Sequence, residues 1–169
     1  IASSVGGANT EEGGDRIVVD DPHNIEEAES EVIRQGVLGW WDEVMSTRGN
    51  DPATVARVVV MQRTHEDDLS GHVLAQGGYH HLCLPARYER RALVSGVRVE
   101  HADAQPHDDC AIGSTDPRTD EGELLWPARF DDVSLTDLAS RMGTYAAAGQ
   151  LQQRPTPRAG ALFRSDWFR

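Results

Sequence analysis

The stretch Arg16-Ile-Val-Val-Asp-Asp-Pro-His-Asn24 is a short apolar run that ends in two adjacent carboxylates and a proline. An uninterrupted apolar run predicts a buried strand, and the acids that follow it then lie at the edge of a sheet. Paired carboxylates at such an edge can hold a hydrated Mg²⁺ and orient a water molecule against a phosphate. An acidic turn closed by Pro22 is the alternative interpretation.

A long helix is expected after this strand. Asn24, followed three residues later by Glu27, is typical of a capping box at a helix start. Apolar residues then recur at a spacing of three and four, which predicts one buried face. They are Ile33, Val37, Trp40, Trp41 and Val44. The tryptophan pair continues this face, so we expect it to anchor the core rather than stack on bases. Helix breakers over residues 48–52 should end the helix.

A second apolar run, Val58-Val59-Val60-Met61, is followed by Gln62 and Arg63. Strand, helix and strand form a βαβ unit, whose crossover makes the two strands parallel. Because parallel strands end at the same edge of a sheet, Gln62 and Arg63 are expected beside Asp20 and Asp21. Ligands of open α/β sheets bind at that edge.

The remaining segments are less regular. We expect a short helix over residues 65–76 and a third strand from Tyr79 to Leu84 that points one of His80 and His81 inward. Residues 94–123 read as an irregular loop or insertion. Its cluster from His101 to Cys110 lacks the spacing of a zinc site and is interpreted as a solvated acidic loop.

A later helix is predicted with Ser134 as its cap and Asp137 in its first turn. Its buried stripe would be Leu138, Met142 and Tyr145, and Gly143 should bend or interrupt it. From Arg154 onward the sequence reads as an extended linker.

Composition narrows the possible functions. The chain has 169 residues, 38% hydrophobic content and a net charge of -12, and no apolar run is long enough to span a bilayer. Such a charge argues against a surface that grips a phosphate backbone throughout. All 16 basic residues are arginine, so a G-x-x-x-x-G-K-[ST] phosphate loop is absent from the sequence. Cys83 and Cys110 lie far apart, which favours a reducing, cytosolic compartment over a disulfide framework.

Several segments stand out together, in one order along the chain. They are Arg16–Asn24, the pair Trp40-Trp41, the run Val60-Met61-Gln62-Arg63-Thr64-His65-Glu66-Asp67-Asp68-Leu69, the stretch Gly122-Glu123-Leu124-Leu125-Trp126-Pro127, the segment Tyr145–Pro155 with its end Leu151-Gln152-Gln153-Arg154-Pro155, and the pair Trp167-Phe168. In their order and spacing these segments resemble the large terminase subunit of tailed bacteriophages. The resemblance covers nearly the whole chain.

The resemblance implies a motor that uses ATP to pump double-stranded DNA into a capsid, together with a metal-dependent nuclease. The strand from Arg16 resembles the family's Walker B element, so Asp20 would coordinate Mg²⁺ through ATP and Asp21 would orient the attacking water. Many relatives carry glutamate in place of Asp21, and the shorter aspartate must lie closer to the water or act through a second one. Gln62 and Arg63 match the coupling motif, which senses the γ-phosphate and passes its loss to DNA-gripping elements.

Two of these roles have structural alternatives. Asp21 could instead cap the helix that follows Pro22. Arg63 could pair with Asp67, four residues further along the chain.

The resemblance also implies a partial protein. In the family a P-loop precedes the Walker B element and a nuclease domain follows the linker. We therefore expect an α/β, partial P-loop NTPase-like fold: half of an ATPase domain over residues 1–93, the irregular segment 94–123, and a helical linker over 124–169. The parent protein would be an ATPase, whereas this chain alone is expected to be inactive.

Partners and location follow from the same resemblance. The complete motor would form a homo-oligomeric ring and bind double-stranded DNA, the small terminase subunit and the portal protein, with no membrane partner. It would be encoded by a phage or prophage and act in the host cytoplasm, transiently at the procapsid portal. The alternatives are a non-catalytic interaction module or remnant that binds the portal or small subunit, and another ATPase motor such as a helicase.

Overall fold

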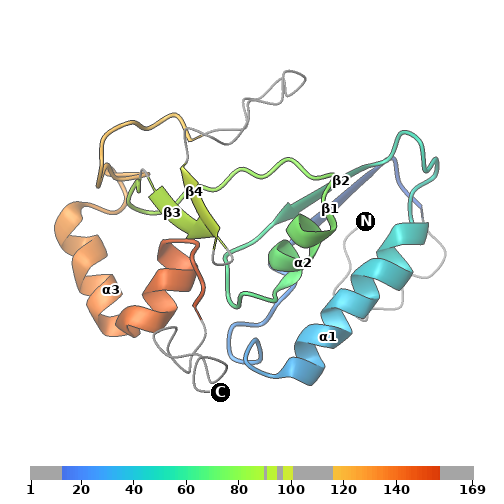
Figure 1. Ribbon diagram of the computed structural model, residues 1–169, viewed down its shortest axis with the longest axis horizontal. Helices are drawn as coiled ribbons and strands as arrows, with labels where there is room; N and C mark the ends of the chain where they lie inside the picture. The colour runs from blue at the N-terminus through green and yellow to red at the C-terminus, as the bar shows by residue number, and fades with distance from the viewer. Residues whose placement is uncertain (1–12, 90, 95–96, 101–115, 157–169) are drawn as a thin grey trace, which may run out of the picture. The chain divides into compact units, whose positions relative to one another are not determined.

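The computed structural model describes residues 13–89, 91–94, 97–100 and 116–156. Within these residues the chain is a mixed α/β protein with a two-stranded parallel sheet, an antiparallel hairpin and three α-helices (Figure 1). It divides into two compact units. The first unit reaches Gln62 and resumes over Asp67–Gln76, and the second contains Arg63–Glu66 and the described residues from Gly77 onward. None of the helices in these ranges has the length and apolar character that a bilayer span requires.

The first unit is built on two parallel strands, β1 (Arg16–Asp20) and β2 (Ala56–Val60). In their register Asp20 lies opposite Val60, so the two strands end at the same edge. Both strands and their parallel pairing confirm what the two apolar runs predict.

Helical segments connect and follow these strands. After β1 come α1 (Glu31–Gly39), a π-helical turn η1 (Trp40–Val44) and a 3₁₀ turn η2 (Met45–Thr47). The helical segment therefore ends where the breakers predict. After β2 comes α2 (Leu69–Gln76), which confirms the expected short helix but starts four residues later than predicted.

The start of the first helix differs from the prediction. The Asn24 side chain accepts a hydrogen bond from the backbone N–H of Glu26 at 2.9 Å, and residues 25–29 form turns. Helix α1 begins only at Glu31, with Ser30 at its N-cap. An asparagine that bonds to the backbone two residues ahead stabilises a turn, and here that local bond prevails over the capping box.

The buried face of α1 is also rotated from the predicted one. Val37 and Trp41 are buried as expected, but Ile33 is 41% exposed. Arg34 is buried instead, and its Nη1 donates to the carbonyl oxygen of Ala28 at 2.6 Å. A paired guanidinium can thus occupy a core position that apolar periodicity alone does not reveal.

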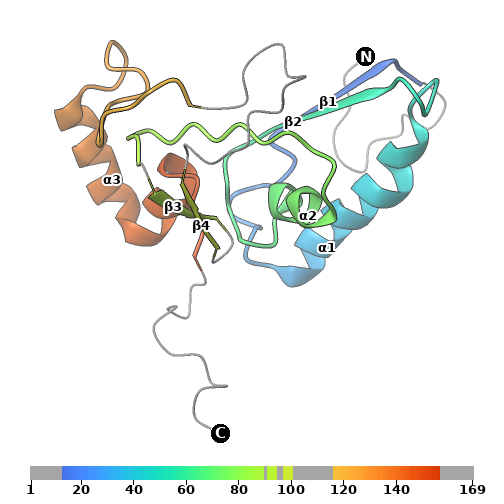
Figure 2. The ribbon, with the colours of Figure 1, turned by 45° about the horizontal axis from the view of Figure 1, so that its top comes forward.

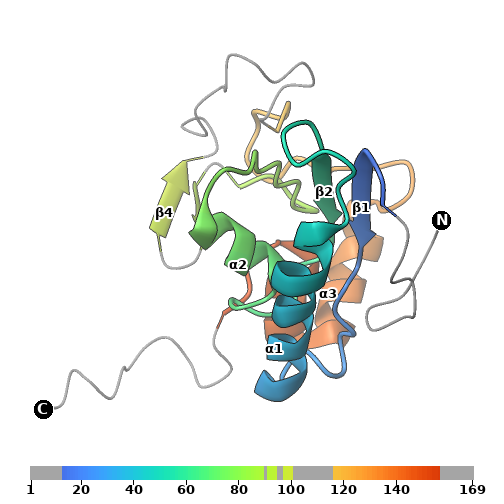
Figure 3. The same cartoon turned by 90° about the vertical axis from the view of Figure 1, so that its right-hand side faces the viewer.

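Within the described residues of the first unit, the helices cover one face of the β1–β2 sheet (Figures 2 and 3). Helices α1 and α2 lie on the same side of the strand pair (Figures 2 and 3). Val19 is 7% exposed, whereas Val18, Val58 and Val60 are 65%, 45% and 54% exposed. Parallel sheets are normally covered on both faces, so three exposed valines mark this face as unusual.

The second unit contains little regular strand structure. Its hairpin pairs β3 (Arg91–Val94) with β4 (Val97–Glu100) in antiparallel register. Strand β4 falls inside the segment 94–123 that the sequence predicts to be irregular, so that expectation is wrong for these residues. A further antiparallel bridge joins Arg87 to Leu124.

A kinked helix completes the second unit. Helix α3 (Asp132–Ala146) continues into a π-helical turn η4 (Ala147–Leu151). Gly143 has φ 78° and interrupts the helix, as predicted. The cap is Asp131 rather than Ser134, because the Asp131 carboxylate accepts from the Ser134 backbone N–H at 2.7 Å. The predicted stripe of Leu138, Met142 and Tyr145 is half-buried, while Leu135 is buried.

The predicted third strand is absent from the described residues, because Tyr79–Leu84 is extended without a ladder partner. Gly77 and Gly78, which precede it, have φ of 78° and 80° and turn the chain. His80 and His81 are both exposed, so the expected inward side chain is wrong as well.

Some expectations fall outside the described residues. They concern the cluster His101–Cys110 and the linker beyond Thr156 with Trp167-Phe168.

Candidate functional site

Asp20 and Asp21 lie at the carboxyl edge of the parallel sheet. Asp20 is the exposed last residue of β1. The next backbone N–H, of Asp21, donates to the carbonyl oxygen of Val60 at 2.9 Å. The Asp21 Oδ1 atom accepts from the backbone N–H of Gln62 at 3.0 Å. Asp21 and Gln62 therefore meet at the edge where the parallel topology predicts them.

The backbone of Asp21 is unusual. Its φ is 40°, in the left-handed region that non-glycine residues rarely adopt, although aspartate tolerates it better than most. This conformation turns the chain out of β1 and aims the carboxylate at the end of β2. Because Ser30 is the N-cap of α1, Asp21 does not cap that helix. Its carboxylate instead bridges the ends of the two strands.

His23, two residues after Asp21, links the segment after β1 to the start of α2. This role was not predicted from the sequence. His23 is 7% exposed, and its Nε2 accepts from the backbone N–H of Leu69, the first residue of α2, at 2.8 Å. A ring nitrogen that accepts a hydrogen bond carries no proton, so this contact holds the Nδ1–H tautomer. Asp68, fully buried, accepts from the N–H of Gly71 at 2.9 Å. The two side chains together cap α2, and the sequence Asp68-Leu-Ser-Gly71 was the available signal.

Arg63 belongs to the second unit, unlike its neighbour Gln62. The side chain is buried, with 4% exposure, and its Nη2 donates to the carbonyl oxygens of His65 at 3.4 Å and Glu66 at 3.2 Å. Its backbone N–H donates to Oε1 of Gln153 at 3.1 Å. Of the predicted site residues, the first unit thus brings together Asp20, Asp21 and Gln62, whereas Arg63 is held by contacts of the second unit.

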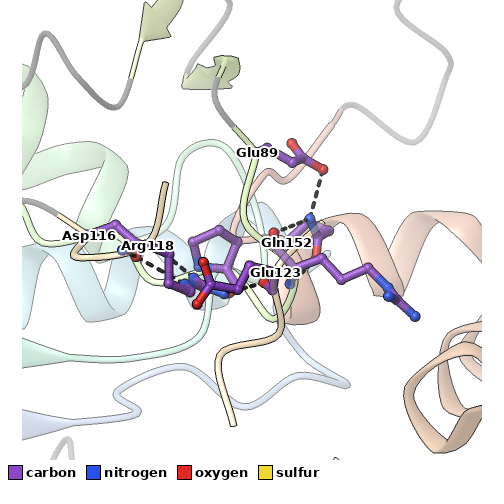
Figure 4. A network of polar contacts seen from close by, with 7 residues as sticks. Glu89, Asp116, Arg118, Glu123 and Gln152 are labelled. Atoms are coloured by element: carbon purple, nitrogen blue, oxygen red, sulfur yellow. Dashed lines mark hydrogen bonds and ion pairs between the residues drawn. The ribbon is translucent and has the colours of Figure 1, made fainter. Parts of the chain in front are cut away.

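The Gln152 side chain forms three hydrogen bonds within the second unit (Figure 4). Its Oε1 accepts from the Arg87 N–H at 3.1 Å, and its Nε2 donates to the Arg87 carbonyl at 3.1 Å and to Glu89 Oε1 at 2.7 Å. The amide pairs with Arg87 as a neighbouring strand would. Arg154 adds an ion pair to Glu89 at 2.8 Å. The sequence singled out Gln152 only as part of a family motif.

Arg118 also bonds to several groups of the second unit, and this role was not predicted from the sequence. Its guanidinium forms a bidentate pair with Asp116 at 2.9 and 2.6 Å, and neither side chain is more than 6% exposed. The same guanidinium donates to the carbonyl oxygens of Glu123 at 2.9 Å and Pro85 at 2.6 Å (Figure 4). It also lies over the Tyr88 ring. This set of contacts is structural, because four of the five guanidinium N–H groups donate to protein atoms.

The thiol of Cys83 has no part in this chemistry. Burial raises its pKa to about 11, so it is protonated and unreactive at neutral pH.

The acids at the sheet edge suit one kind of metal. In the described ranges, no group of three or more His, Cys, Asp or Glu side chains could hold an ion by itself. Mg²⁺, however, is commonly held by one or two carboxylates together with waters and substrate phosphates. The exposed Asp20 carboxylate with Asp21 beside it fits Mg²⁺ that arrives with a phosphate ligand.

Neither a protein-family model nor a curated protein matches this chain.

Proposed function

We propose that this chain is part of the ATPase domain of a terminase large subunit, a motor that couples ATP hydrolysis to the movement of double-stranded DNA into a capsid. The observation that carries the proposal is the contact between Asp21 and Gln62 at 3.0 Å. It joins the residue after the Walker B-like strand to the first residue of the coupling-motif match, and both lie at the edge where open α/β sheets bind ligands.

In this proposal Asp20 would hold the Mg²⁺ that arrives with ATP, and the metal would supply positive charge that stabilises the transferred phosphoryl group. Asp21 orients the attacking water. Because Asp21 Oδ1 also accepts from Gln62, its carboxylate is held at a fixed orientation. Gln62 and Arg63 would carry the loss of the γ-phosphate to the rest of the chain.

The open sheet face supports the same proposal. A nucleotide-binding sheet of the P-loop type has helices on both faces, whereas Val18, Val58 and Val60 lie exposed on one face here. Since the sequence contains no lysine, the phosphate-binding loop must come from polypeptide outside this chain. We propose that the P-loop half of the domain covers this face.

The wider assembly remains part of the proposal. The completed motor would work as a ring in the host cytoplasm, bind double-stranded DNA, and dock on the portal protein with the small terminase subunit.

The test is reconstitution of ATP hydrolysis. The chain alone should show no turnover, and joining it to a segment that carries G-x-x-x-x-G-K-[ST], encoded in an adjacent reading frame, should produce it. Asp20→Ala should abolish the reconstituted activity. Asp15→Ala, at the opposite end of β1, is the matched control and should retain it. A steady ATPase rate from the chain alone that disappears in Asp20→Ala, or a reconstituted rate indifferent to Asp20→Ala, would contradict the proposal.

A further inference from the structure

Two residues share an uncommon backbone conformation. Among the described residues, Asp21 and Gln153 are the non-glycine positions with positive φ, at 40° and 54°. Non-glycine residues in this region are strained, and such strain gathers where the surrounding structure demands a particular geometry. Both residues use it in the same way. Asp21 Oδ1 binds the backbone N–H of Gln62 at 3.0 Å, and Gln153 Oε1 binds the next backbone N–H, of Arg63, at 3.1 Å.

The chain passes from the first unit to the second between these two N–H groups. The Asp21 contact lies wholly within the first unit, and the Gln153 contact lies wholly within the second. The N–H groups of Gln62 and Arg63, one on each side of the boundary, thus each donate to a side chain. The two acceptors, Asp21 and Gln153, are far apart in the sequence.

Further contacts fix the Arg63 side of this link. A Cβ at Gly149 would lie 2.8 Å from the Arg63 carbonyl oxygen, so only glycine allows the backbone of η4 to approach so closely. The Gln153 amide is itself oriented, because its Nε2 donates to the Gln150 carbonyl at 2.7 Å. The segment from Gly149 to Gln153 therefore forms a preformed seat for the Arg63 backbone.

We propose that the Gln62–Arg63 link is a joint whose two sides are held independently, by Asp21 on one side and by Gln153 on the other, and that Gln153 is the positioning residue for Arg63. The seat follows from the contacts above. Its consequence for coupling rests on the proposed function: if Asp21 turns its carboxylate to the attacking water, it would release the N–H of Gln62 while Arg63 stays in its seat. The joint would then pass the state of the ATP site to the second unit.

Amide hydrogen exchange on the whole chain tests the seat. Gln153→Met keeps the side-chain volume but removes the acceptor, and it should speed exchange of the Arg63 amide by about tenfold, the loss expected for one hydrogen bond. The Gln62 amide should not respond to this change. Asp21→Ala should show the reverse, exposing the Gln62 amide and leaving that of Arg63 protected. Gln150→Met, three residues earlier, is the matched control and should alter neither amide.

Two results would overturn the joint. The Arg63 amide could keep its protection in Gln153→Met, or Asp21→Ala could expose both amides together. If Gln153→Met does not fold, Gln153→Asn replaces it, because asparagine tolerates the left-handed backbone while its shorter side chain cannot reach the Arg63 amide. None of these measurements needs nucleotide. Failed reconstitution of ATPase activity would therefore refute the proposed function and leave the joint intact, and the reverse also holds.

Discussion

The two units of this protein are stabilised in different ways. In the first unit, paired backbone strands and a helical crossover set the topology, and side chains such as Asp21 and His23 finish the ends of elements. In the second unit, side chains take the place of strand partners: Gln152 pairs with Arg87, and Arg118 bonds to two carbonyl groups. A unit of the first kind is sensitive to apolar truncation, whereas a unit of the second kind is sensitive to the loss of single polar side chains.

The largest effect is expected at Arg118. Arg118→Met leaves the Asp116 carboxylate buried without its partner, and breaking such a pair costs about 4 kcal/mol of unfolding free energy. Urea unfolding gives the total loss, and amide exchange should assign it to the second unit while the β1–β2 amides stay protected. An equal loss of amide protection in both units would contradict the view that the two units are stabilised in different ways. Arg141→Met is the control, because the exposed Arg141–Asp137 pair should contribute less than about 1 kcal/mol.

The next effect tests the first unit. Leu69 is fully buried beside the His23 contact, and Leu69→Ala should cost about 3 kcal/mol from lost burial and the cavity left behind. Val18→Ala, on the open sheet face, should change the unfolding free energy by no more than about 0.5 kcal/mol. A large loss in Val18→Ala would mean that this sheet face is covered in solution.

The same contrast explains what could be predicted from the sequence. The strands β1 and β2 come from uninterrupted apolar runs, and their parallel pairing follows from the length of the crossover, so the meeting of Asp21 and Gln62 was predictable. The start of α1 was not, because one local hydrogen bond of Asn24 decides it. Apolar periodicity indicates which face of a segment is buried. It does not indicate at which residue the helix begins.

The second unit was less predictable for a related reason. Gln152 and Arg118 bond to residues dozens of positions away, and no local pattern marks a glutamine that replaces a strand partner. The extended segment Tyr79–Leu84 has strand-like composition but lacks a ladder, so the expected third strand was wrong. The division between Gln62 and Arg63 was equally hidden, because the Arg63 backbone contacts Gly149 and Gln153, which lie dozens of positions further along the chain.

A moderate effect is expected at Gln152. Gln152→Ala removes hydrogen bonds from both backbone groups of Arg87 and should cost about 2 kcal/mol. Gln76→Ala in the first unit is a matched control: its side-chain amide donates to the exposed Asp42 at 3.2 Å, and its loss should cost less than about 0.5 kcal/mol. Equal costs for the two glutamines, measured by urea unfolding, would remove the distinction between the units.

The smallest effect concerns pH and the first unit. The hydrogen bond from His72 is the main cause that lowers the pKa of Asp42 below its usual 3.8, and Gln76 adds to it. A carboxyl whose pKa is lower in the folded state adds stability above its unfolded pKa and loses that stability as pH falls through the folded value. Because Asp42 is exposed, the contribution should be only about 0.5 kcal/mol. In urea titrations between pH 6 and pH 3, Asp42→Asn should flatten the acid limb of the stability curve slightly. An unchanged acid limb in Asp42→Asn would show that the His72 contact contributes nothing to the free energy of unfolding in solution.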